Sequence, residues 1–443
     1  MSLSHEADYV MSLLDKAGAE GDLLIDQQSS LALSVKDATL EEHKVSSSQV
    51  FGLRVIKDNK AGIAYSEASD DAALKSMVEQ ALVNATYSET EARERIPASS
   101  DETSTDDSLL CPVQETGIEE KIELALQLET GLTEKAWVKN VPYNGLEEVQ
   151  RESYLYNSAG RTTHSKSRIN VAYTYALLEK GEHNVMSGSG QAERLFSNLL
   201  PQDLINHVYD SSLALLEGKP VATGHYDVIF DEECQAQVFG AFSTLFSGKA
   251  AKDGINPMRD KVGEIITDPR LTISDQPLLT EGLSYHLFDS EGSLTRSVPL
   301  ITEGRLDSFV HNTVTAAHFN LDTTGNASRG PKSALDVAVH QLNVAAGTDG
   351  SNSLLAGEYL ELTDLTGTHS GANAVSGDFS FGASGFLCRD GKRVQPVRGV
   401  TVAGNFYQML AKINAVGDKQ RWNWERSALM PAIRFADVAI SGD

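Results

Sequence analysis

The sequence predicts an α+β protein of two domains. Its 443 residues are too many for one compact core. In the first half, helical patterns precede groups of strands instead of alternating with single strands, which favours a sheet with helices on one face over a doubly wound sheet. After Gly218-Lys219-Pro220, glycines become frequent and short β-branched runs appear. We therefore predict an N-terminal α+β domain over residues 1–222, with two similar helix-plus-strands halves, and a C-terminal, mainly β domain with a few packed helices over residues 223–443.

The first half of the N-terminal domain shows helical periodicity followed by extended runs. Val10, Leu13 and Leu14 lie on one helical face, and Asp58-Asn59 supplies turn residues between two of the runs. The expected elements are a helix from Ser4, strands at Leu31 to Val35, Gln49 to Ile56 and Lys60 to Tyr65, and a helix from about Asp70 to Thr86.

The second half is predicted to repeat this plan after a polar, acidic segment. That segment, Pro97 to Ser108, has few apolar residues and is expected to be a solvated loop. The elements expected after it are a helix from Glu119 to Leu132, extended segments at Val149 to Asn157 and Ile169 to Leu177, and a helix from Asp203 to Leu216.

One helix is expected in the C-terminal domain, from Glu232 to Ser247. The Asp231 carboxylate is placed to cap it. Its apolar stripe, which we expect to pack on a sheet, consists of Cys234, Val238, Phe242 and Leu245.

Composition limits the partners and the compartment. The formal net charge of −25 and the lack of a Lys/Arg-rich block argue against nucleic acid. No run of about 18 apolar residues and no signal-like N-terminus is visible, so we expect a soluble cytoplasmic protein without membrane contact. Cys111, Cys234 and Cys388 are far apart and form no C-x-x-C, which predicts reduced, mostly buried thiols.

Motifs for metal or nucleophilic catalysis are missing. There is no H-E-x-x-H, and His5-Glu6 has no second histidine within a helical turn. His311 and His318 are seven residues apart, a spacing better explained by packing or surface roles than by metal binding. The string around Ser384 departs from G-x-S-x-G, because Phe386 occupies the last position. We expect neither a catalytic residue nor a metal ligand in this chain.

One loop carries candidate binding residues, TTGNASRG from Thr323 to Gly330. Its glycines let the backbone approach a ligand, Asn326 offers a donor and an acceptor, and Arg329 can clamp a carboxylate. A plain polar turn is an equally good interpretation on chemistry alone.

Five ordered segments, strongest from about Tyr226 to Val416, resemble the TldD/PmbA family, formerly called modulators of DNA gyrase, and its PmbA (TldE) branch in particular. The segments are EECQAQVFGAFSTLFSGKAAKDG, KVGEIITDPRLTISDQP, FDSEGSLTRSVPLITEGRL, TTGNASRG, and SGDFSFGASGFLCRDGKRVQPVRGVTVAGNFYQML with NAVGD. In the TldD branch, zinc is held by H-E-x-x-x-H on a helix and by a C-terminal cysteine. Here the equivalent helix reads VFGAFSTLFSG, and no cysteine follows Cys388.

The resemblance implies a cytoplasmic metallopeptidase complex in which this chain pairs with a zinc-holding TldD-type subunit and acts on flexible peptides. This chain itself would carry no zinc and would supply substrate enclosure and assembly, with homodimerisation possible when it is alone. We expect Thr324, Asn326 and Arg329 to lie near the shared groove or the subunit interface. The open alternatives are a self-sufficient homodimeric peptidase or hydrolase and a non-catalytic peptide-binding scaffold. The charge balance gives no support to the gyrase label.

Overall fold

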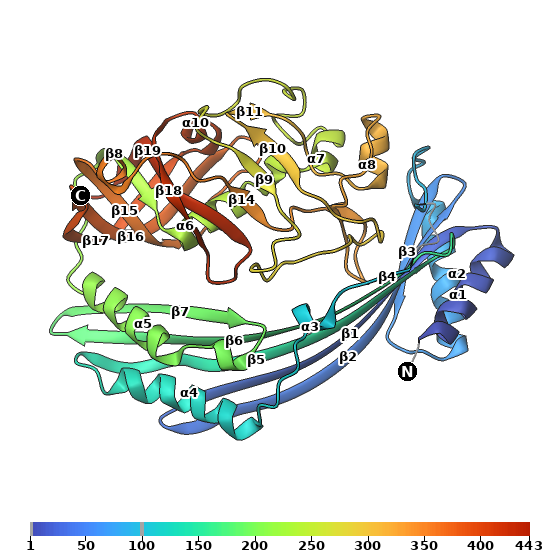
Figure 1. Cartoon of the computed structure of the whole chain (residues 1–443), viewed down its shortest axis with the longest axis horizontal. Helices are drawn as coiled ribbons and strands as arrows, with labels where there is room; N and C mark the ends of the chain where they lie inside the picture. The colour runs from blue at the N-terminus through green and yellow to red at the C-terminus, as the bar shows by residue number, and fades with distance from the viewer. Residues whose placement is uncertain (1–2, 98–101) are drawn as a thin grey trace.

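The computed structural model describes residues 3–97 and 102–443 and contains two large sheets. The N-terminal sheet is a long, curved arc, and the C-terminal domain lies on its concave side (Figure 1). This confirms the α+β class and the mainly β character of the C-terminal half. The shape leaves a seam between the two parts that runs along the arc.

The N-terminal sheet has seven strands in the order β3-β2-β1-β5-β6-β4, with β7 also paired to β6. Its two halves follow the same plan, a helix, three antiparallel strands and a helix, as expected from the sequence. The elements are α1 (Ser4–Ala17), β1 (Glu20–Lys36), β2 (Thr39–Lys57), β3 (Lys60–Ser66), α2 (Asp71–Tyr87), β4 (Glu102–Ser104), α3 (Asp107–Leu110), α4 (Ile118–Thr133), β5 (Val138–Asn157), β6 (Thr162–Lys180), β7 (His183–Glu193) and α5 (Pro201–Leu215).

The convex face of this sheet is apolar and carries the four long helices. At one end, α1 and α2 bury Leu23, Ile25 and Phe51 of β1 and β2. At the other end, α4 and α5 bury Leu33 of β1 and Leu146 of β5. Successive residues of a strand point to opposite faces of the sheet. Along each strand, the residues that alternate with these apolar positions therefore face the C-terminal domain.

The turn between β1 and β2 is held by a helix of the other half. Asp37 and Ala38 both have left-handed backbone (φ 52° and 56°), which suits a tight hairpin but is unusual without glycine. The buried carboxylate of Glu129 on α4 accepts hydrogen bonds from both of their N–H groups, at 2.7 and 2.9 Å. The far end of the hairpin is therefore fixed to the helical layer.

The C-terminal domain is built on a ten-stranded sheet that begins with β8. Its core is rich in phenylalanine, with Phe242 stacked on Phe406 at 4.5 Å between ring centroids. The elements are β8 (Gly224–Phe230), α6 (Glu232–Ala241), α7 (Gly248–Lys252), β9 (Ile273–Asp275), β10 (Val298–Thr302), β11 (Arg305–Leu306), α8 (Thr313–His318), β12 (Ala327–Ser328), β13 (Asp336–Val337), β14 (Leu342–Val344), α9 (Ser351–Leu354), β15 (Glu358–Thr366), β16 (Asp378–Arg389), β17 (Lys392–Asn405), α10 (Phe406–Leu410), β18 (Ile413–Trp422) and β19 (Ala428–Ser441).

Two predicted segments differ from the structure. The α-helix expected from Glu232 to Ser247 ends at Ala241, because Phe242 leaves helical geometry (φ −110°, ψ 20°). A short 3₁₀ helix, Ser243–Phe246, follows, and Ser247 then caps α7. Asp231 does cap the first helix, through the N–H of Cys234. The segment expected to be a loop from Pro97 to Ser108 contains β4 and the start of α3, and its residues 98–101 lie outside the described part.

The strands of the first sheet are also much longer than predicted, because polar residues continue their pairing.

The contact of Glu129 with the hairpin turn predicts a stability effect. Glu129→Ala should lower the free energy of unfolding by about 1–2 kcal/mol, because two N–H groups of an exposed turn with left-handed backbone lose a charged acceptor. Urea unfolding measures this, with Glu134→Ala, an exposed position at the end of α4, as the control. Equal midpoints for the two variants would contradict the proposed anchoring.

Candidate functional site

The loop Thr323–Gly330 lies in the seam between the two sheets, where hydrogen bonds fix its path. Thr324 is buried, and its hydroxyl accepts from the N–H of His311 at 2.7 Å. The amide of Asn326 is also buried and donates to Asp275 at 2.5 Å and to the carbonyl of Ala338 at 2.9 Å. The side-chain oxygen Oδ1 of Asn326 has no hydrogen-bond partner among the described residues. The side chains of Thr324 and Asn326 therefore hold the loop against neighbouring segments of the C-terminal domain.

Arg329 reaches from this loop into the N-terminal sheet. Its buried guanidinium group pairs with Asp22 on β1. The same carboxylate pairs with Arg54 on β2 at 2.6 Å, and Arg54 also contacts Glu291 of the C-terminal domain at 3.0 Å. We call Asp22, Arg54, Glu291 and Arg329 the seam cluster. It joins the two domains with two positive and two negative charges.

Burial sets the energetics of the seam cluster. Burial alone would raise the pKa of Asp22, but the guanidinium groups of Arg329 and Arg54 hold it below its usual value. Burial lowers the pKa of Arg329, against the pull of Asp22. Removing one member of such a group leaves an unpaired buried charge and costs roughly 3–5 kcal/mol. Substitution of Arg329 would therefore change domain packing as well as any ligand contact.

A cavity of about 300 Å³ lies beside the seam cluster, between the concave face of the sheet and the loops of the C-terminal domain. Among the described residues, its charged lining is one carboxyl group, Asp289, and four arginines: Arg151, Arg168, Arg194 and Arg329. Arg194 donates to the carbonyls of Thr280 and Gly282, and no described carboxylate pairs with it. Arg151 and Arg329 are already paired with Asp26 and Asp22, so the positive charge left for a ligand comes from Arg168 and Arg194. In a chain of net charge −25, these two groups suit a ligand that carries a carboxylate.

Two stacked imidazoles, His286 and His340, line the same cavity, with ring centroids 4.5 Å apart. The surrounding protein and the neighbouring His340 lower the pKa of His286 to about 4. Burial also lowers the pKa of His340, whose Nε2 lies 2.9 Å from the carbonyl of Gly325. Both rings are therefore neutral near pH 7 and can exchange hydrogen bonds with a ligand.

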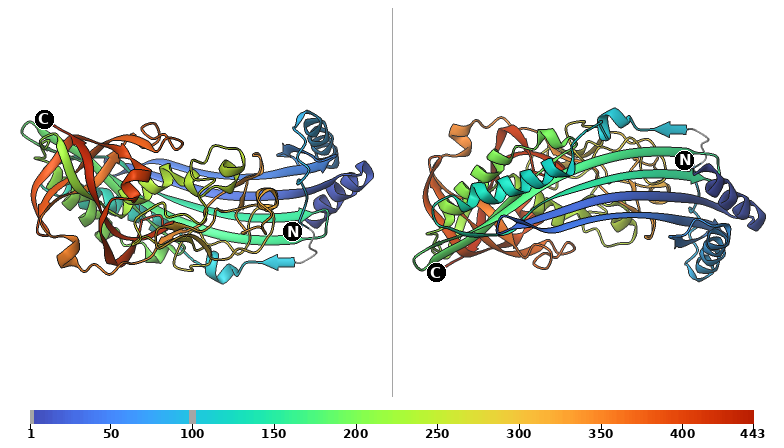
Figure 2. Two further views of the ribbon diagram at one scale, coloured as in Figure 1. Left: turned by 90° about the horizontal axis from the view of Figure 1, so that it is seen from above. Right: turned by 90° about the horizontal axis from the view of Figure 1, so that it is seen from below.

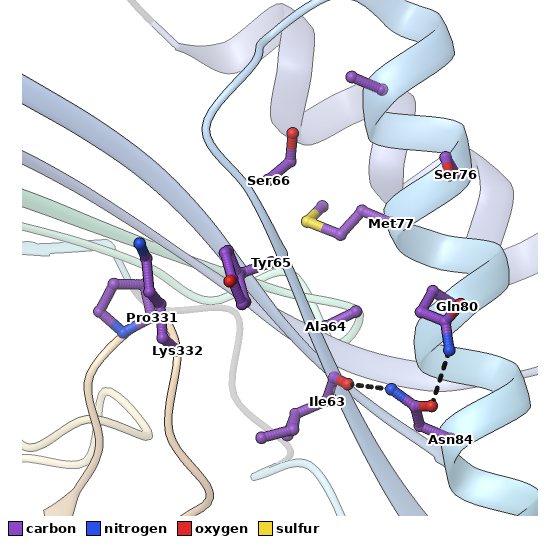
Figure 3. Close-up of a pocket in the computed structure, with 11 residues that line it drawn as sticks. Ile63, Ala64, Tyr65, Ser66, Ser76, Met77, Gln80, Asn84, Pro331 and Lys332 are labelled. Carbon is purple, nitrogen blue, oxygen red and sulfur yellow. Dashed lines mark hydrogen bonds between the residues drawn. The ribbon is translucent and has the colours of Figure 1, made fainter.

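A second hollow, of about 480 Å³, opens on the other side of the loop (Figure 3). It lies between β3 and α2, and Pro331 and Lys332 border it from the C-terminal domain. Lys332 sits over the ring of Tyr65 at 4.8 Å and pairs with Glu67 at 2.5 Å. Because β3 is the last strand of its sheet, its outer main-chain groups run beside this hollow, which we call the β3 groove.

The loop reaches the β3 groove because β2 has a glycine below it. A Cβ atom at Gly52 would lie 2.1 Å from the carbonyl oxygen of Pro331, far inside van der Waals contact. The absence of a side chain at Gly52 thus allows the loop to rest on the sheet.

The positions of the His, Cys, Asp and Glu side chains bear on a possible metal site. Over 3–97 and 102–443, no three His, Cys, Asp or Glu side chains are grouped so that they could hold a metal ion. His311 and His318 do not form a pair, because His311 is buried before α8 and His318 ends that helix. Cys111, Cys234 and Cys388 are all buried and unpaired, as expected.

Sequence reasoning identified the loop but missed its partners. The two contacts between the domains join residues that are far apart in the sequence. Asp22 and Arg329 are 307 positions apart, and Arg54 and Glu291 are 237 positions apart, so no local pattern links them. The one available signal was a charged residue inside each of two apolar strand runs, Asp22 in GDLLI and Arg54 in FGLRVI.

No helix in the described part of the chain is long and apolar enough to cross a membrane.

Comparison with known proteins gives a consistent result. The model of the PmbA/TldA metallopeptidase C-terminal domain matches residues 223–442, and that of PmbA/TldA metallopeptidase domain 1 matches residues 21–85. The chain is 25% identical to the metalloprotease PmbA homolog of Haemophilus influenzae, over 94% of this chain and 91% of that protein. It is 30% identical to metalloprotease PmbA of Escherichia coli O157:H7 over 51% of this chain and 49% of that protein.

Solved structures share the fold. A putative modulator of a DNA gyrase from Thermotoga maritima has a TM-score of 0.86 at 21% identity, covering 99% of this chain and 100% of that one. TldE from Thermococcus kodakarensis has a TM-score of 0.84 at 21% identity, with 100% of each chain covered.

The buried His311 beside this loop predicts a pH effect on stability. Burial lowers its pKa to about 4, whereas the unfolded chain protonates it near 6.5. The folded state therefore loses stability as the pH falls from 6.5 towards 4, by up to about 3 kcal/mol from this group. Urea unfolding across this range should give a smaller loss for His311→Gln than for the unmodified chain. Parallel curves would show that His311 does not cause the effect.

Proposed function

Since the chain belongs to the PmbA/TldD metallopeptidase family, we propose that it is the PmbA/TldE-like subunit of a cytoplasmic complex that degrades or processes flexible peptides. In this proposal a TldD-type partner holds the zinc ion, and this chain supplies substrate enclosure and assembly. One observation carries the proposal: the chain matches a metallopeptidase domain, but its described residues offer no group of metal ligands.

The two histidines of the cavity beside the seam cluster fit the same division of roles. His286 and His340 are stacked with an interplanar angle of 26°, and no third His, Cys, Asp or Glu side chain among the described residues completes a ligand group with them. Their cavity also carries four arginines, whose charge opposes the binding of a cation. We assign no catalytic residue to this chain.

The β3 groove is our candidate for contact with the peptide (Figure 3). The Ile63 carbonyl at the edge of β3 accepts from Nδ2 of Asn84 at 2.8 Å, so an extended peptide that adds to this edge would displace that amide (Figure 3). The peptide would be held by main-chain hydrogen bonds, which place few demands on its sequence. Side chains of α2, such as Ser76, Met77 and Gln80, form the opposite wall. Thr324, Asn326 and Arg329 would act indirectly, because they fix the loop that ends at Pro331 and Lys332.

Cleavage of an unstructured peptide tests the subunit role. We expect no cleavage by this chain alone, and cleavage when it is mixed with a TldD-type protein from the same organism. Zinc-dependent cleavage by this chain alone would instead support a self-sufficient, homodimeric peptidase. Peptide binding by this chain, without any cleavage in the mixture, would support a peptide-binding scaffold.

A matched pair of variants tests the β3 groove. Ser76→Trp fills the groove from an exposed position of α2, whereas Glu79→Trp places the same side chain on α2 outside the lining. We expect Ser76→Trp to weaken binding of a labelled unstructured peptide at least tenfold by fluorescence anisotropy, with Glu79→Trp unchanged. Equal affinities would remove the groove from the proposal. Arg329 is avoided because its loss would disturb the seam cluster.

A further inference from the structure

The concave face of the sheet carries three tyrosines at the end where α4 and α5 cover the convex face. Figure 2 shows these two helices crossing the strands at the end of the arc nearest the C-terminus. Ala172 of β6 points into that helical core. Its neighbour Tyr173 therefore points to the concave face, as does Tyr175 two residues further on. Tyr143 of β5 lies directly opposite Tyr175.

Glycines let two of these rings lie against the sheet. A Cβ atom at Gly188 would be 2.2 Å from ring carbons of Tyr175, and a Cβ atom at Gly145 would be 2.8 Å from the hydroxyl of Tyr173. Tyr175 nevertheless remains 38% exposed. Tyr143, whose ring lies 5.8 Å from that of Tyr175 and at 83° to it, is 59% exposed. Aromatic surface on the concave side is therefore accessible to a ligand.

Two carboxylates lie beside these rings. Burial raises the pKa of Tyr173, and the nearby charges of Glu147 and Glu42 raise it further. Glu147 is two residues from Gly145 on β5, and Glu42 lies opposite Ser34, which is itself opposite Gly145, so both face the concave side. Both glutamates are exposed. We call Tyr143, Tyr173, Tyr175, Glu42 and Glu147 the tyrosine platform.

The lysines around the tyrosine platform balance its negative charge only in part. Lys139 and Lys180, at the same end of β5 and β6, are paired with Glu179 and Glu217. Lys44 of β2 lies on the concave face and supplies one positive charge against the two carboxylates of the platform. In a chain of net charge −25, this surface attracts a positively charged group.

Lysine and arginine side chains match this combination of groups. Their cationic ends are attracted both to the faces of tyrosine rings and to carboxylates, and their apolar stems pack on aromatic surface. The platform lies in the same seam as the cavity beside the seam cluster, because Ser167 lines that cavity and Tyr173 is about 20 Å further along β6. The β3 groove lies at the other end of the sheet (Figure 1), so the platform would be a second contact for an extended chain.

We propose that the tyrosine platform binds a lysine or arginine side chain of an extended peptide in the seam. This inference rests on the proposed function, because it names the class of peptide that this chain holds. Acidic peptides would be repelled from the same place by Glu42 and Glu147.

Two peptides that differ in one charge test the platform. The probe is a labelled unstructured peptide with a single central lysine, and its match carries norleucine, which keeps the apolar stem without the ammonium group. By fluorescence anisotropy with this chain alone, we expect the lysine peptide to bind about fivefold more tightly. Equal affinities, or binding of neither peptide, would overturn the inference, whereas the proposed function is decided separately by cleavage in the mixture with a TldD-type protein.

Variants show whether the platform causes the preference for lysine. Tyr175→Leu removes the ring and should reduce the preference to less than twofold, whereas Tyr175→Phe keeps the ring and should retain it. Glu147→Gln should weaken binding of the lysine peptide but not of the norleucine peptide. The controls are Tyr87→Leu, at a position 86% exposed on α2, and Glu134→Gln, exposed at the end of α4, and both should behave as the unmodified chain. A preference that survives in Tyr175→Leu would overturn the inference.

Two further measurements separate the platform from other sites. The preference for lysine should persist in Ser76→Trp, because the β3 groove is at the other end of the sheet. Its loss in Ser76→Trp would place the lysine in the groove and contradict the inference. Unchanged peptide affinities in Tyr175→Leu, together with lost binding to the TldD-type protein, would assign the platform to a subunit contact and would likewise overturn it.

Discussion

The arrangement of the two domains depends on the seam cluster, four charges that are buried in the docked structure and pair across the domain boundary. Asp22 and Arg54 lie on neighbouring strands, but Arg54 needs Glu291 and Asp22 needs Arg329 to complete their pairing. Taking these charges out of water is costly, so the attraction across the seam stabilises one docked arrangement strongly. The loop from Thr323 to Gly330 is placed by this requirement, and the cavity and the β3 groove lie on its two sides.

The long sheet serves two different purposes on its two faces. Its convex face is apolar and forms the cores with α1, α2, α4 and α5. Its concave face carries small and polar side chains such as Ser153, Ser165 and Ser167, which border a cavity instead of closing it. A surface of this kind can face a polar chain without collapsing onto it, which suits a protein that encloses peptides.

Periodicity and capping predicted the helices well, because these signals are local. Helices from Ser4, near Asp70, near Glu119 and near Asp203 all appear within a few residues of the expected bounds. The strands were shortened in the prediction, because polar runs such as SSSQ in β2 lack the apolar alternation that marks a half-buried strand. Arg329 was found from the chemistry of its loop, but its partners were not, since ion pairs over hundreds of positions leave no trace in spacing.

The wide sequence separation within the seam cluster has a consequence for the order of synthesis. Asp22 leaves the ribosome 307 residues before its partner Arg329. Arg54 leaves it 237 residues before its partner Glu291. Until then, the nascent N-terminal sheet carries charges whose partners do not yet exist, and its concave face remains open to water. The docking of the two domains can therefore be completed only after translation has passed Arg329, and chaperones have that interval in which to bind the open face.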